Sequence, residues 1–144
     1  MKKLVLVLLL FVSLIIPNQI KAEDVLIVDD LNVFSSDAIT KYAPYLEDIS
    51  NKYQIDLLVY ITDTQTDKSI ELFAADYAES HGCYDALAFV VNYYLGEYII
   101  IGMGNAEKYG GYLSWGEELV YESLKNQNFD EVLAQYTTFA YNIT

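Results

Sequence analysis

The chain has 144 residues, 53% of them apolar, and a formal net charge of −13. This length suits one domain, and the apolar share is far above that of a disordered segment. The chain has 21 acidic residues and no arginine, which excludes a basic surface for nucleic acid or anionic lipid. One cysteine and one histidine exclude a disulfide framework, a zinc finger and a multi-histidine metal centre.

The first 22 residues have the layout of a secretory signal peptide. Two lysines precede an apolar run at 4–16, a proline breaks the run, and Ala22 offers a small residue at the cleavage edge. The run is shorter than the roughly 20 residues that a membrane-spanning helix needs. We therefore expect cleavage after Ala22, with residues 23–144 forming one secreted or extracytoplasmic domain without a stable membrane span. The alternative is an uncleaved N-terminal anchor. The mature domain has five lysines against 21 acids, a charge of −16.

A short strand and a helix are predicted first in the mature domain. The apolar β-branched run at 25–28 indicates the strand, and the serine pair 35–36 can cap the helix. Apolar residues then recur at steps of three and four over 39–53, which predicts one buried helical stripe. Pro44 lies inside this stripe and has no amide hydrogen, so we expect a kink or a restart of the helix there.

A strand, a helix and a second strand are predicted next. Residues 55–62 are nearly all apolar, as in a strand covered on both faces, and 85–92 have the same character. The helical stripe at 70–77 lies between them, and Gly82 can end that helix. Such a crossover makes the two strands parallel. The strand at 97–103 follows after only four residues, which is too short for a crossover and predicts an antiparallel hairpin.

Two further helices are predicted beyond the glycine pair at 110–111. Ser114 with Glu117, and Asn128 with Glu131, have the spacing of a capping box at a helix start. The predicted fold class is therefore α/β. We expect a three-layer α/β/α sandwich with a small mixed sheet, made of a parallel pair plus an antiparallel hairpin strand.

Several short motifs, taken in chain order, resemble the TPM domain family. Residues 28–30 (Val-Asp-Asp) are similar to the valine-aspartate pair that opens the family pattern, and 55–62 to its next strand. Asp85 stands where the family has an Asp-Asn-Gly triplet, and 102–104 where it has a glycine-x-glycine strand end. The resemblance implies an exported α/β/α sandwich and a capacity for calcium binding. For a plant lumenal branch it also implies an acid phosphatase activity.

Acidic residues gather at the predicted carboxyl ends of the parallel strands, where open α/β sheets bind ligands. Asp63 follows the strand at 55–62, and Asp29 and Asp30 precede the first helix, whose start lies at the same edge. Oxygen ligands without basic neighbours suit Ca²⁺ or Mg²⁺. The other interpretation is that these aspartates are turn formers and helix caps.

Asp85 joins these three as a candidate metal ligand through the family resemblance alone. The predicted topology puts it at the opposite edge of the sheet, beside the glycine turn at 102–104. Either the domain has two sites or Asp85 anchors that turn by side-chain to backbone hydrogen bonds, and we favour the anchor.

The remaining candidates are polar and aromatic side chains near loops. His81 and Cys83 lie two positions apart with no third group to orient them, so we assign them no catalytic role. Tyr93, Tyr94 and Tyr98 surround the predicted hairpin and form the predicted recognition surface.

Two functions stay open at this point. The first is an extracytoplasmic, non-enzymatic binding module with Ca²⁺ or Mg²⁺ in its acidic loops, no organic cofactor and a protein partner in the cell envelope. The alternative is a metal-assisted acid phosphatase that acts on phosphomonoesters. The negative charge repels a phosphoester unless a metal ion supplies positive charge, which favours the binding module.

Overall fold

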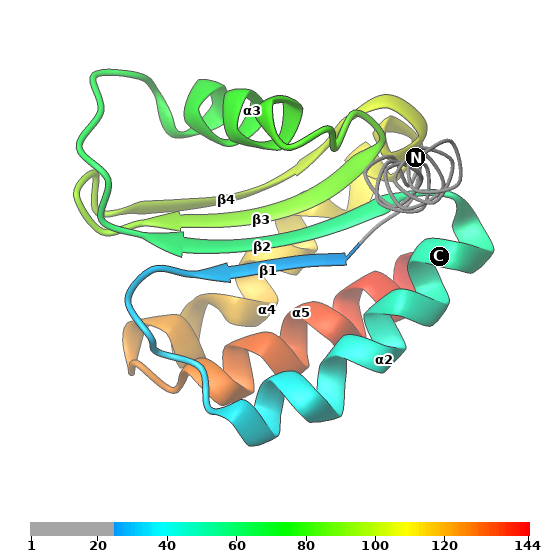
Figure 1. The fold of residues 1–144 in the computed structure, drawn as a ribbon, viewed down its shortest axis with the longest axis horizontal. Helices are drawn as coiled ribbons and strands as arrows, with labels where there is room; N and C mark the ends of the chain where they lie inside the picture. The colour runs from blue at the N-terminus through cyan, green and yellow to red at the C-terminus, as the bar shows by residue number, and fades with distance from the viewer. Residues whose placement is uncertain (1–24) are drawn as a thin grey trace, which may run out of the picture.

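A four-stranded sheet lies between two helical layers in the computed structural model, which describes residues 25–144 (Figure 1). The strands lie across the sheet in chain order: β1 (Val25–Asp29), β2 (Asp56–Thr62), β3 (Ala86–Asn92) and β4 (Glu97–Gly102). β1, β2 and β3 are parallel, and β4 is antiparallel to β3. The predicted mixed α/β sandwich is therefore confirmed, and β1 extends the parallel pair to three strands. The predicted signal peptide, residues 1–22, lies outside the described residues.

The helices divide unequally between the two faces of the sheet. α3 (Ile70–Ser80) packs on one face, and α2 (Ser36–Tyr53), α4 (Leu113–Lys125) and α5 (Phe129–Ile143) cover the other (Figure 1). A 3-10 segment, η2 (Gly104–Tyr112), joins β4 to α4. None of the helices within residues 25–144 is long and apolar enough to cross a membrane.

The two central strands carry the core. Every residue of β2 and β3 is buried, as the apolar runs predict. Because successive side chains of a strand point to opposite faces, Leu57 and Phe89 enter the core under the three helices, whereas Leu58 enters the core under α3. The Tyr136 hydroxyl on α5 donates to the Leu87 carbonyl oxygen at 2.7 Å, so this buried phenol has its hydrogen bond.

Helix α2 continues through Pro44, so of the predicted kink or restart the restart is wrong and the kink stays a prediction. A proline leaves the carbonyl four residues earlier, here that of Thr40, without its helical partner. Both residues are exposed, so water can solvate this carbonyl and the helix continues. At its start, the Ser35 hydroxyl accepts the Ala38 N–H at 3.0 Å, which confirms the predicted cap.

Helix α3 ends as the sequence predicts. Gly82 has a φ of +74°, a conformation that glycine adopts without a steric penalty. The N–H of Gly82 donates to Glu79 O at 3.0 Å, and that of Cys83 to Ala78 O at 2.9 Å. These two bonds satisfy carbonyls that have no partner within the helix.

Neither predicted capping box forms. Helix α4 follows η2 directly, and the Leu113 N–H donates to the Gly110 carbonyl oxygen. This N–H at the start of α4 is therefore satisfied by the backbone of the preceding turn and not by a side chain. Glu117 instead reaches across to the sheet, where its Oε1 accepts the Ile100 N–H at 3.1 Å. Asn128 precedes α5 without a side-chain capping bond.

Candidate functional site

The carboxyl ends of β1, β2 and β3 meet at one edge of the sheet, called the carboxyl edge below. Asn92 ends β3 and is fully buried there. Its Nδ2 donates to the Thr64 carbonyl at 3.0 Å, and its Oδ1 accepts the Tyr94 N–H at 2.9 Å. One amide side chain therefore holds the β2–α3 loop against the β3–β4 turn.

Asp29 shapes the loop between β1 and α2. Its Oδ1 accepts the Val33 N–H at 3.0 Å, and its Oδ2 accepts the Phe34 N–H at 2.8 Å. Both carboxylate oxygens thus bond to the backbone of the loop that begins α2. This is the turn-forming role that the sequence left open for Asp29.

Asp30 contacts the next strand rather than its own loop. Its Oδ2 accepts the Tyr60 hydroxyl at 3.0 Å and the Thr62 hydroxyl at 2.8 Å. Asp63 follows Thr62 and is exposed. Across residues 25–144 no group of three or more His, Cys, Asp or Glu is arranged to hold a metal ion. The Ca²⁺ or Mg²⁺ site therefore stays a prediction, with Asp29, Asp30 and Asp63 as its candidate ligands at this edge.

Asp85 lies at the other end of β3, away from the carboxyl edge. Its Oδ1 accepts the Asn105 N–H at 2.9 Å. Gly104 approaches so closely that an added Cβ would stand 2.5 Å from the Tyr84 carbonyl oxygen and would also overlap the Asp85 carboxylate. Asp85 therefore anchors the glycine turn, which is the role favoured for it from the sequence.

His81 and Cys83 have bonding partners unlike those of a catalytic pair. The His81 Nδ1 lies 2.8 Å from the Tyr77 carbonyl oxygen, and its ring stacks on Tyr77 with centroids 4.1 Å apart. The Cys83 side chain is buried, with its Sγ 3.8 Å from the His81 carbonyl oxygen. Burial and the neighbouring Tyr60 raise the pKa of Tyr77 to about 12. The Tyr77 phenol is therefore protonated at neutral pH.

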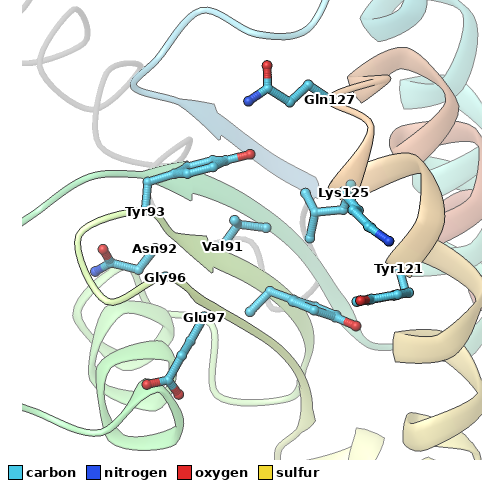
Figure 2. Close-up of a pocket in the computed structure, with 10 residues that line it drawn as sticks. Val91, Asn92, Tyr93, Gly96, Glu97, Tyr121, Lys125 and Gln127 are labelled. Atoms are coloured by element: carbon cyan, nitrogen blue, oxygen red, sulfur yellow. The ribbon is translucent and has the colours of Figure 1, made fainter.

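A cavity of about 260 Å³ opens at the carboxyl end of β3, between the β3–β4 hairpin and the end of α4 (Figure 2). We call it the tyrosine pocket. Its lining includes Val91, Tyr93, Tyr98, Tyr121, Leu124, Lys125 and Gln127. In Figure 2, Tyr121 and Lys125 project from α4, whereas the Asn92 amide and the Glu97 carboxylate point away from them.

The tyrosines of this pocket are held in different ways. The Tyr98 hydroxyl donates to the Glu117 carbonyl oxygen at 3.1 Å. The Tyr93 ring meets Phe129 edge-on with centroids 6.4 Å apart. Burial raises the pKa of both phenols, and the Glu117 charge adds to the rise at Tyr98. Both phenols are protonated at neutral pH, and the proton of Tyr98 is used in its bond to Glu117. Tyr121 is 46% exposed.

The pocket matches part of the predicted recognition surface. Tyr93 and Tyr98 line it, but Tyr94 lies outside and its hydroxyl accepts the Gln65 amide N–H at 3.2 Å. Sequence analysis missed Tyr121 and Lys125. Their spacing of four on a predicted helix was a signal that they share one helical face, but nothing local placed that face beside the hairpin.

A second cavity of about 440 Å³ lies on the outer surface of the three-helix layer. It runs between α2 and α5 and is lined by Tyr42, Tyr45 and Tyr141. Tyr45 and Tyr141 are 57% and 70% exposed, and Asp29, Asp30, Asp63 and Asp85 do not line it.

Comparison with known proteins identifies the fold. No family model and no curated protein sequence matches the chain. The N-terminal domain of the cg2496 protein from Corynebacterium glutamicum, a solution NMR structure, matches with a TM-score of 0.63. Its identity is 14%, over 90% of this chain and 85% of that one. The BA42 protein from the psychrophilic bacterium Bizionia argentinensis matches with a TM-score of 0.61 and 10% identity, over 80% of this chain and 86% of that one.

These likenesses define the class of the chain as an α/β/α sandwich domain that also occurs in these two bacterial proteins. The resemblance to the TPM domain family stays a prediction.

Proposed function

We propose that the protein is an extracytoplasmic, TPM-like binding module that recognises its ligand at the tyrosine pocket. The observation that carries this proposal is the composition of the cavity. Val91 and Leu124 supply apolar surface, and the tyrosine side chains and Gln127 supply polar groups beside it. Ligand sites in proteins commonly combine an apolar lining with a few placed polar groups.

The size of the pocket bears on the kind of ligand. Its volume of about 260 Å³ lies just below the range of about 300–1,000 Å³ that is usual for small-molecule sites. It suits one small group, such as a single side chain of a protein partner. Tyrosines are also enriched where proteins bind one another. Both points support a partner in the cell envelope.

The bonding of the acidic residues favours binding over phosphatase chemistry. Asp29 holds backbone amides, and Asp30 holds two hydroxyls. Lys68, the lysine nearest in sequence to the β2–α3 loop aspartates, forms an ion pair with Asp76. Phosphoryl transfer needs positive groups around the transferred oxygens, and the ion pair of Lys68 with Asp76 competes with such a role for this lysine.

The test is a binding screen followed by amide NMR on the purified chain. Probes of several chemical classes, namely organic cations, carboxylates, neutral sugars and Ca²⁺, are titrated separately. We expect at least one organic probe to shift the amides of Tyr93, Tyr98 and Tyr121 together. Tyr121→Ala should remove the response, and Tyr141→Ala, at another exposed tyrosine, should retain it.

The proposal is wrong if no organic probe moves these amides. Turnover of an aryl phosphate that disappears in Asp30→Asn and Asp63→Asn, with both variants folded, would instead support the phosphatase.

A further inference from the structure

A cation already lies in the tyrosine pocket. The Lys125 Nζ stands 5.9 Å from the centroid of the Tyr121 ring. Within residues 25–144 the ion pair present is Lys68 with Asp76, so Lys125 has no carboxylate at ion-pair distance. The face of an aromatic ring attracts cations through its quadrupole. Lys125 is thus positioned by an aromatic ring rather than by an acid.

The surroundings of the pocket carry negative charge. Burial raises the pKa of the Tyr98 hydroxyl, and the nearby charges of Glu117 and Glu118 add to that rise. The Glu117 carboxylate is fixed there by its bond to the Ile100 N–H at 3.1 Å. The whole chain has a net charge of −13, so its field also favours the approach of a cation and opposes that of an anion.

The cavity supplies more than one ring for such a cation. Tyr93, Tyr98 and Tyr121 come from the hairpin and from α4, two different sides of the cavity. Several aromatic rings around one cavity, with acids nearby, form the kind of site that binds quaternary ammonium and guanidinium groups. We infer that the tyrosine pocket binds an organic cation. The cation is either a small molecule or a lysine or arginine side chain of a protein partner.

This inference rests on the proposed function and gives its ligand a chemical class. It also assigns Lys125 a role, since a tethered ammonium over Tyr121 occupies the position that the ligand needs. Removal of Lys125 should therefore strengthen the binding of a cation. A carboxylate ligand would give the opposite result, because it would lose an attractive charge.

The test uses the purified chain and probes at constant ionic strength. The cationic probes are tetramethylammonium, N-acetyl-arginine amide and a short arginine-containing peptide. N-acetyl-citrulline amide is the matched neutral probe, and N-acetyl-leucine carboxylate is the anionic one. Binding is followed by the amide shifts of Tyr93, Tyr98 and Tyr121.

We expect the cationic probes to bind and the citrulline probe to bind at least about fivefold more weakly. Tyr121→Leu should weaken cation binding by about fivefold or more, and Lys125→Gln should strengthen it. Lys108→Gln is the matched control, since Lys108 lies over Tyr109, a tyrosine outside the pocket, at 5.2 Å. That variant should change the affinity for the cation only slightly, because it removes one positive charge from outside the pocket.

The probes distinguish the two sources of the cation, and they distinguish failure of this inference from failure of the proposed function. Binding of tetramethylammonium assigns a small-molecule source, and binding of the arginine amide and the peptide without tetramethylammonium assigns a partner side chain. If the neutral or anionic probe shifts the pocket amides and the cations do not, or if Lys125→Gln weakens cation binding, this inference is wrong while the proposed function stands. If no probe shifts them, both are wrong.

Discussion

The two ends of the sheet each use an aspartate to hold backbone N–H groups but differ in what surrounds it. At the carboxyl edge, Asp29 accepts two backbone N–H groups of the following loop. At the opposite end, Asp85 accepts the Asn105 N–H, and Gly104 packs directly against it. Gly104 leaves no room beside Asp85, whereas the carboxyl edge opens into the tyrosine pocket.

The comparison separates the aspartates from the recognition surface. Asp29 and Asp85 each hold the backbone of a loop or turn, one at either end of the sheet. What distinguishes the end that has a cavity is the tyrosines of the hairpin and of α4. The aspartates therefore do not mark the candidate site. The aromatic side chains do.

At the end of the sheet with Asp85, added side-chain volume should lower the free energy of unfolding most. In Gly104→Ala the new Cβ must stand 2.5 Å from the Tyr84 carbonyl oxygen, at a backbone φ of +55°. Both the overlap and the left-handed conformation oppose alanine, so we expect a loss of more than about 3 kcal/mol in the free energy of unfolding. Denaturant unfolding measures it. Gly110→Ala, with no heavy atom within 4 Å of its new Cβ, should stay near the parent.

Calcium is the next largest effect, if the carboxyl edge holds the predicted site. Ca²⁺ at a hundredfold excess over its Kd raises the free energy of unfolding by about 2.7 kcal/mol. Asp63→Asn should remove that gain and leave the metal-free protein almost unchanged, because Asp63 is exposed. Asp85→Asn should retain the gain, since Asp85 lies at the other end. A melting temperature that does not respond to millimolar Ca²⁺ would exclude the site.

Asp29 should matter to stability whether or not calcium is present. In Asp29→Asn one side-chain oxygen becomes an NH₂ group, which cannot accept the N–H of Val33 or Phe34. We expect a loss of about 1–2 kcal/mol by denaturant unfolding. Asp67→Asn, an exposed aspartate in the β2–α3 loop, is the matched control. Equal stability of the two variants would contradict the structural role of Asp29.

The smallest expected effect is the pH dependence of the contact between Asp130 and Ser35. The Ser35 hydroxyl and N–H donate to Asp130 at 2.6 and 2.9 Å and hold its pKa below the ordinary 3.8. A lowered pKa stabilises the fold above the unfolded-state value, and this stability is lost as the pH falls through the folded-state pKa. Asp130→Asn should therefore be slightly less stable than the parent from pH 5 to 8, and the gap should close below about pH 3.8. A gap that widens in acid would contradict this sign.

Sequence patterns predicted those parts of the fold that depend on neighbours along the chain. The apolar runs identified β2 and β3, and the four-residue connection required β4 to be antiparallel. Gly82 was identified as the end of α3 for the same reason. Each of these features is decided within about 30 residues, by burial or by the geometry of one turn.

The errors and omissions come from contacts that sequence spacing does not encode. Glu117 has the spacing of a capping residue, yet its carboxylate bonds to the Ile100 N–H across the core. Tyr121 belongs to the candidate site only because α4 packs beside the β3–β4 hairpin. At Pro44 a local pattern predicts an interruption of the helix that does not occur. Thr40 and Pro44 lie on the exposed side of α2, where water can solvate the carbonyl that the proline leaves without a partner.

The bond between Ser35 and Asp130 also bears on the order in which the protein can fold. The two residues are 95 positions apart, and they join the start of α2 to the first turn of α5. A chain that emerges amino end first therefore presents α2 without this contact until almost the whole domain has followed. The apolar stripe of α2 packs in the same core as α5, so it too lacks part of its cover until then. This layer is therefore complete only when the last helix of the domain is in place.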